Sequence, residues 1–214
     1  MKTQVSPKDA TQERILQAAE EVFSEQGYHA ASVDEIVRLS DTSKGGVYFH
    51  FPSKERLFFA VMDGLAGKLV QRVQRAVDRE ATAQRKSEVA LETVLNTLGE
   101  HKRLARLLLL QGYSMGKGFE AKRRQMFARF ASQIEVVLQQ AARDGAIPPL
   151  NARVASYAWL GAISEVVMLW LGSEEAPSPK EAYPTLRVLL LRSVGFQDTP
   201  DKIKPNVRRA GLAS

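Results

Sequence analysis

One short segment, residues 43–50 (SKGGVYFH), gathers hydrogen-bond donors around a pair of glycines. Lys44 supplies a cation, and a tyrosine and a histidine follow it. Gly45 and Gly46 are unusual in a helix, because each costs roughly 1 kcal/mol relative to alanine in a helix interior. A backbone that comes close to DNA would explain them, since exposed amides and Lys44 can then meet phosphate without obstruction by side chains. The alternative is that the segment is a loop.

Catalytic chemistry has little support elsewhere in the sequence. The histidines His29, His50 and His101 are scattered, and no nucleophile elbow is present. Gly116 to Gly118 lacks the strand that a phosphate-binding loop requires. The absence of cysteine removes disulfides, thiolate zinc sites and cysteine nucleophiles together. We therefore expect no enzyme activity, no metal and no cofactor, in a chain that resides in the cytoplasm.

The elements around the glycine pair are predicted to be helices. Apolar residues recur with helical spacing, and no segment alternates as a strand does, so the sequence predicts an all-α fold. Helices are expected over 7–26, 33–39 and 43–50, the first ending at Gly27 and the second starting with a capping box of Ser32 and Glu35. A three-residue turn joins the last two, which is the spacing of a helix-turn-helix.

Longer helices are predicted beyond this unit. Ser53 caps a fourth helix that runs towards Arg79, and later helices are expected near 86–100, 102–112, 119–144, 151–171 and 179–195. The predicted domains are a helix-turn-helix DNA-binding domain over 1–53, a helical effector-binding and dimerisation domain over 54–196, and a mobile tail over 197–214.

Bulk charge says little about nucleic-acid binding. The chain has a net charge of +6, but residues 1–60 hold seven Lys or Arg against nine Asp or Glu. A protein that coats nucleic acid without selectivity needs a basic face, which this acidic segment does not predict. Any DNA contact must therefore depend on where particular donors lie.

The run VDEIVRLSDTSKGGVYFHFPSKERLF, from Val33 to Phe58, resembles the DNA-binding signature of TetR-type repressors. The preceding ILQAAEEVFSEQGYHAAS is similar to the first helix and turn of that family, so the resemblance covers residues 11–58. The remainder resembles the family only in length and helicity. Two positions depart from the pattern: Asp41 stands where glycine is frequent, and Thr42 stands where an apolar residue is common. Asp41 can adopt the left-handed turn conformation, though less freely than glycine.

The resemblance implies a set of DNA contacts, residue by residue. Phosphate contacts are expected from Ser32, Tyr48, His50 and Lys54, and groove contacts from Ser43, Lys44, Gly45, Gly46 and Phe49.

Two of these residues, Tyr48 and His50, have an alternative role. Tyr48 could be a core aromatic residue with its hydroxyl in solvent, and His50 could pack between the first and fourth helices. Lys54 lies in the first turn of a helix, where a cation opposes the helix dipole, and a nearby phosphate would relieve that conflict.

The segment 154–172, VASYAWLGAISEVVMLWLG, is apolar nearly all round. Its most membrane-like stretch, Ala158 to Gly172, is shorter than a membrane span and carries Glu165. We therefore expect a buried helix and no membrane contact. Pairing it with residues 183–196 and with the same helices of a second subunit would form a four-helix homodimer interface, which the resemblance also implies. Glu165 would then pair with Arg187 or Arg192, or lie at the rim in water.

The remaining helices have room for a ligand cavity. Its predicted apolar lining is Leu107, Leu110, Tyr113, Met115, Phe119, Phe127, Phe130, Ile134, Trp159 and Ile163, and its predicted polar groups are Gln111, Tyr113 and Ser114. The alternative is that these residues are only core.

The sequence thus predicts a dimeric regulator of transcription that binds a double-stranded operator. We expect a repressor that a small, largely apolar effector releases from DNA. The alternative is a helix-turn-helix protein without a small-molecule effector.

Overall fold

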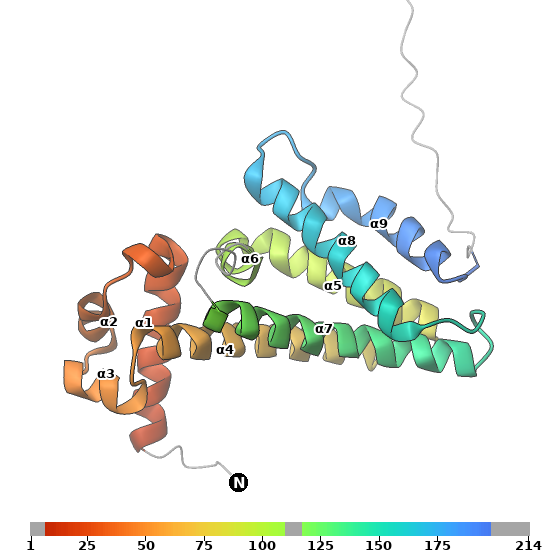
Figure 1. Cartoon of the computed structure of the whole chain (residues 1–214). Coiled ribbons are helices and arrows are strands. Elements are labelled where there is room, and N and C mark those ends of the chain that lie inside the picture. The colour runs from red at the N-terminus through yellow and green to blue at the C-terminus, as the bar shows by residue number, and fades with distance from the viewer. Residues whose placement is uncertain (1–6, 110–116, 198–214) are drawn as a thin grey trace, which may run out of the picture.

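The structure is a computed structural model that describes residues 7–109 and 117–197. The fold of these residues is all-α, as predicted (Figure 1). One end of the molecule, here called the head, consists of α1 (Pro7–Ala30), α2 (Val33–Ser40) and α3 (Lys44–His50). The rest, here called the body, consists of α4 (Lys54–Val77), α5 (Ala83–Glu100), α6 (Lys102–Leu109), α7 (Lys117–Arg143), α8 (Ala152–Gly172) and α9 (Pro179–Ser193).

Serine side chains set the starts of the helices near the head. The hydroxyl oxygens of Ser32, Ser43 and Ser53 accept hydrogen bonds from the backbone amides of residues 34, 46 and 56 at 3.2, 3.0 and 3.1 Å. Each bond satisfies an amide that a helix start would leave unpaired. A capping box at α2 would also require the Glu35 side chain to accept from the backbone amide of Ser32. That prediction is wrong, because the Glu35 Oε2 atom accepts from the Gln26 Nε2 atom at 2.7 Å instead.

Two turns in the head have the backbone that the sequence predicts. Gly27 interrupts α1 with φ 76° and ψ 172°, and one further turn continues to Ala30. Asp41 closes α2 in the left-handed conformation, with φ 49° and ψ 49°. The departure from glycine at this position therefore leaves the helix-turn-helix turn intact.

Large apolar side chains hold the short head helices together. Phe23 of α1, Ile36 of α2, Val47 of α3 and Phe58 of α4 are each at most 1% exposed. Helices of seven or eight residues are marginal alone, so this shared core stabilises them. Because Phe58 of α4 contributes to this core, the core joins the head to α4 of the body.

The body is a layered bundle around α4 and α7, which run side by side away from the head (Figure 1). α5 packs against α4, α8 lies across α7, and α9 packs on α5. α5 begins at Ala83, earlier than predicted, because Thr82 caps it by accepting from the Arg85 amide at 3.2 Å. The end of the predicted 102–112 helix and the tail beyond residue 197 lie outside the described residues. The domain boundaries stay a prediction.

α8 is the helix in the described part of the chain that is long and apolar enough to cross a membrane by length and composition. Core helices of folded proteins pass the same test. One side of α8, including Trp159 and Val167, is buried against the body. The other side is exposed in the single chain, and its predicted burial, which needs a second subunit, stays a prediction.

Candidate nucleic-acid interface and effector cavity

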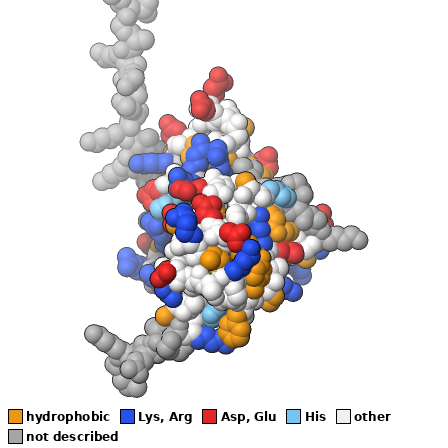
Figure 2. All heavy atoms as spheres, turned by 90° about the vertical axis from the view of Figure 1, so that its left-hand side faces the viewer, with side chains coloured by type: hydrophobic (Ala, Val, Ile, Leu, Met, Phe, Trp, Pro, Cys, Tyr) orange, Lys and Arg blue, Asp and Glu red, His pale blue; other side chains and the backbone are white. Residues whose placement is uncertain are grey.

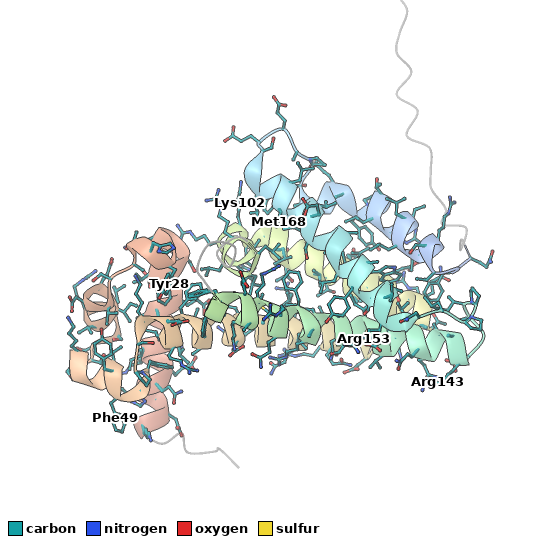
Figure 3. All side chains as sticks on the ribbon, viewed as in Figure 1. Tyr28, Phe49, Lys102, Arg143, Arg153 and Met168 are labelled. Carbon is teal, nitrogen blue, oxygen red and sulfur yellow. The ribbon has the colours of Figure 1, made fainter. Side chains whose placement is uncertain are left out.

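α3 turns one side to the core and the other to solvent. Val47 is buried, whereas Tyr48 is 41% and Phe49 72% exposed. Phe49 lies on the outer side of α3 in Figure 3. The alternative that residues 43–50 form a loop is wrong, since α3 spans Lys44–His50. Tyr48 lies outside the core, so its ring and hydroxyl can reach a partner.

The two glycines of α3 differ in what surrounds them. A Cβ atom on Gly45 would meet nothing closer than the Ser43 Oγ at 3.9 Å, but one on Gly46 would lie 3.3 Å from that oxygen. Neither glycine has a positive φ. Packing within the protein therefore explains Gly46, which leaves room for the capping hydroxyl, but it does not explain Gly45. Close approach of DNA at Gly45 stays a prediction.

Lys44 is exposed but engaged within the head. Its ammonium nitrogen lies 2.7 Å from the Asp34 Oδ1 atom of α2. The hydrogen bond to Asp34 raises the pKa of Lys44, so the side chain carries a full positive charge. A DNA phosphate or base would have to compete with this carboxylate for it.

Ser32 and Ser43 lie on the surface as helix caps. Each hydroxyl oxygen accepts a backbone bond, which leaves its hydrogen able to donate to a phosphate. His50 is half-buried, with its ring centroid 5.3 Å from that of Phe49 and 6.4 Å from that of Phe51. These contacts leave both of the roles considered for His50 open.

Lys54 has protein partners that the sequence does not indicate. Its ammonium donates to the His29 carbonyl oxygen at 3.1 Å and lies 4.8 Å from the centre of the Tyr28 ring. Burial lowers the pKa of Lys54. The carbonyl at the end of α1 and the aromatic face thus offset the unfavourable position of a cation at a helix start. A phosphate contact from Lys54 stays a prediction.

The surface of the head is mixed in charge. Figure 2 faces this end of the molecule and shows Lys, Arg, Asp and Glu side chains interspersed, with hydrophobic side chains between them. Such a surface offers individual donors rather than a continuous basic face. It therefore suits docking at defined phosphates better than general attraction to nucleic acid.

A cavity of about 140 Å³ lies within the body. Its walls are mostly apolar and come from α4 through α9. Representative lining residues are Val73, Leu91, Val94, Phe130, Ile134 and Ile163. Phe127 and Trp159 line this cavity, and the Trp159 indole donates to the Ser193 Oγ at 3.1 Å.

Two residues predicted for the cavity lie elsewhere. Leu107 is buried but does not line it, and Phe119 belongs to a separate aromatic cluster. Leu110, Gln111, Tyr113, Ser114 and Met115 fall outside the described residues. The walls from α4 and α5 were not predicted, although the apolar stripe of α4, which continues through Val73 to Val77, was a signal for them.

Phe119 joins the start of α7 to the head. Its ring centroid lies 4.7 Å from that of Phe59, 5.1 Å from that of Tyr28 and 5.6 Å from that of Phe58. Tyr28 lies where the head meets the body (Figure 3). Met126, one of the cavity-lining residues, also borders the space beside Phe119. Met126 therefore borders both the cavity and the space beside the aromatic cluster that includes Tyr28, the ring over which Lys54 lies.

Ion pairs also connect the head to the body. Glu20 of α1 lies 3.1 Å from the Lys68 ammonium of α4. Glu25 of α1 lies 3.0 Å from the Arg103 guanidinium of α6. These side chains are substantially exposed, so each pair contributes little stability by itself. They join α1 to α4 and to α6.

An apolar face remains uncovered on α8 and α9. Val154, Tyr157 and Leu169 of α8 are 64%, 43% and 57% exposed, and Leu189 of α9 is 60% exposed. A Cβ atom on Gly161, in the same face, would meet nothing within 4 Å. Contiguous exposed apolar surface of this kind is typical of protein interfaces.

Glu165 lies exposed beside this face. Its pairing with Arg187 or Arg192 across a dimer interface stays a prediction. In the single chain, the Arg187 Nε and Nη2 atoms donate to the Glu88 Oε1 atom at 3.1 and 2.9 Å. Glu88 is 2% exposed and also contacts Arg85. A buried carboxylate needs such partners, which accounts for the position of the Arg187 side chain.

Comparison with known proteins gives matches to the head and to most of the chain. The family model described as bacterial regulatory proteins, tetR family, matches residues 15–61. The fatty acid metabolism regulator protein of Bacillus subtilis is 23% identical over 163 residues, which are 76% of this chain and 84% of that protein. The transcriptional activator FasR of Mycolicibacterium smegmatis is 26% identical over 168 residues, 78% of this chain and 75% of that protein.

A solved structure shares the fold over nearly the whole of its length. The FadR regulator of Bacillus subtilis, in complex with stearoyl-CoA, matches with a TM-score of 0.76 and 22% identity. The match covers 87% of this chain and 99% of that one.

Proposed function

Because this chain belongs to the tetR family of regulatory proteins and is a helix-turn-helix DNA-binding regulator, we propose that it is a homodimeric repressor released from DNA by an acyl-type effector. One observation carries the proposal. The apolar cavity of the body adjoins, through Met126, the aromatic cluster that contacts the head. A ligand in the cavity can therefore act on the position of the DNA-binding helices.

The proposed DNA contacts come from the head and from the first turn of α4. They are Ser32, Ser43, Lys44, Gly45, Gly46, Tyr48, Phe49, His50 and Lys54. The exposure of Tyr48 and Phe49 and the open space around Gly45 support this assignment. Phosphate contacts would fix the register of α3 in the major groove, and Lys44 and Phe49 would read base edges.

The uncovered face of α8 and α9 supports the homodimer. Two copies related by a two-fold axis would bury Tyr157 and Leu169 against each other's α8 and α9 in a four-helix interface. The two heads would then bind two half-sites of one operator, spaced about 34 Å or somewhat more along the DNA. Both the protein and the operator would be in the cytoplasm.

The walls of the cavity support an apolar effector. Aromatic and aliphatic residues such as Phe127, Trp159 and Ile163 favour a hydrocarbon chain by burial of apolar surface. The related regulator of Bacillus subtilis is named for fatty acid metabolism, and the structural neighbour was solved with stearoyl-CoA. An acyl compound is therefore the effector class that we propose here.

Coupling between effector and DNA would follow α4 and the aromatic cluster. α4 begins at Lys54 beside the head and lines the cavity from Leu69 to Val77. Occupancy that shifts Met126 would press on Phe119 and so on Tyr28. For release, the effector must bind the DNA-free arrangement of the heads more tightly, and a coupling of about 1–3 kcal/mol, or 5- to 150-fold in affinity, is ordinary.

The test is operator affinity measured with and without a series of acyl compounds, for the wild type and for Phe127→Trp. The larger side chain should fill the cavity and weaken the effector response by about tenfold or more. Val136→Trp is the matched control, because Val136 lies on the same helix but is 60% exposed.

The outcomes separate the candidate functions. Acyl compounds that lower operator affinity support the repressor. Compounds that raise operator affinity would overturn release from DNA by the effector. If no acyl compound changes DNA binding and Phe127→Trp has no effect, the helix-turn-helix protein without a small-molecule effector is the better description.

A further inference from the structure

The cavity has a polar end and an apolar end. Its wall follows α5 from Lys86 to Leu98, positions that are twelve apart and therefore separated by about 18 Å along the helix. α4 and α5 are antiparallel neighbours, so Gln74 and Val77 lie at the Lys86 end. The opposite end is lined by aliphatic side chains, among them Leu108 of α6.

Lys86 is the charged residue among the described residues that line the cavity. It is half-buried, and among these residues no carboxylate lies within ion-pairing distance of it. The nearest acidic residue along α5, Glu88, is already paired with Arg85 and Arg187. An ammonium beside apolar walls is partly desolvated, and an anion brought by a ligand would compensate that loss.

We propose that the effector is an amphiphile whose anionic group binds Lys86 and whose hydrocarbon tail extends towards α6. This inference rests on the proposed acyl effector and specifies its charge and its direction in the cavity. The anion is either the carboxylate of a free fatty acid or a phosphate of an acyl-CoA, since both are acceptors for the lysine ammonium.

This direction places the end of the tail at the helix that touches the head. Leu108 and Leu109 of α6 line the inner end of the cavity. The same helix is tied to α1 by Arg103 and Glu25, and its Lys102 lies over the Trp170 ring of α8 at 5.1 Å (Figure 3). A tail that is long enough to displace the α6 leucines would shift α6 and so alter its contact with α1. A shorter tail fills the cavity without that displacement.

The experiment compares three twelve-carbon ligands: dodecanoate, dodecanoyl-CoA and the uncharged ester methyl dodecanoate. Binding to the full-length protein is measured by titration calorimetry for the wild type, Lys86→Gln and Lys86→Arg. Arg79→Gln is the matched control, because it removes the same unit charge near the end of α4 from a residue that does not line the cavity.

We expect at least one anionic ligand to bind the wild type about tenfold or more tightly than methyl dodecanoate. Lys86→Gln should remove that preference while leaving the affinity for the ester unchanged, and Lys86→Arg and Arg79→Gln should keep it. Preference for dodecanoate identifies a carboxylate, and preference for dodecanoyl-CoA alone identifies a phosphate.

Two results would overturn the inference in distinguishable ways. If all three ligands bind the wild type equally and Lys86→Gln changes nothing, the lysine head stays in water, its stem only covers apolar wall, and the acyl effector stands without the anionic contact. If none of the ligands binds, the acyl effector fails and the role of Lys86 fails with it.

Discussion

Replacement of Gly45 by alanine separates the stability of α3 from its function. Gly45 is the second residue of α3, its φ is not positive, and an added Cβ would meet nothing closer than 3.9 Å. Alanine at such a site loses less conformational entropy on folding than glycine does, which favours the folded state by about 0.5 kcal/mol. For a chain of this length, that corresponds to a rise of about 1–2 °C in Tm.

The same methyl group should damage DNA binding. If the amide of residue 45 meets a phosphate, the methyl holds the backbone away from it and removes a charge-assisted hydrogen bond. Bonds to charged groups contribute about 1.5–3 kcal/mol, so operator affinity should fall by about tenfold to a hundredfold. We therefore expect a protein that is more stable and binds DNA less well.

The assay pairs thermal unfolding at fixed protein concentration with operator titration at fixed salt. Gly64→Ala is the control, because Gly64 is an exposed glycine in α4 whose added Cβ meets nothing within 4 Å. It should raise Tm and leave DNA binding unchanged. Equal operator affinity for Gly45→Ala, Gly64→Ala and the wild type would refute the close approach of DNA to α3.

Three further predictions concern charge, assembly and the buried ion pair. Lys54→Ala should weaken binding to all DNA sequences and lower the slope of log affinity against log salt by about 0.9, and an unchanged slope would leave Lys54 with only its structural role at Tyr28. Gly161→Arg should place a charge in the exposed α8 face and give folded monomers in sedimentation, so a persistent dimer would move the interface elsewhere. Arg187→Met should lower the free energy of unfolding by about 3 kcal/mol in urea denaturation, because it removes a partner of the buried Glu88 carboxylate, whereas a loss below about 1 kcal/mol would mean that Arg85 suffices.

The local signals in the sequence predicted the helices of the head well. Ser32, Ser43 and Ser53 cap their helices through bonds to amides two or three residues away, and Asp41 takes the left-handed turn. These features depend on neighbours in the chain, so their residue types are informative by themselves. The capping box at Glu35 failed because a residue outside the helix, Gln26, offered a competing hydrogen bond.

The cavity was predicted only in part. The periodicity of α7 and α8 identified Phe127 and Trp159 as inward-facing, and both line the cavity. It also assigned Phe119 to the cavity, although that ring packs on Tyr28 instead. A helical period shows which side of a helix is apolar but not which neighbour covers that side, because the crossing of two helices depends on the shapes of both surfaces.

The sequence by itself determined the order of the helices, the caps and turn of the helix-turn-helix, and the placement of donors on α3, because each depends on residues a few positions apart. Tertiary structure alone decided the partners of distant charges. Lys54 reaches the carbonyl of His29, 25 residues away, and Arg187 reaches Glu88, 99 residues away. Such contacts form where desolvation makes an unpaired charge unfavourable, and burial at a given residue is a property of the whole fold.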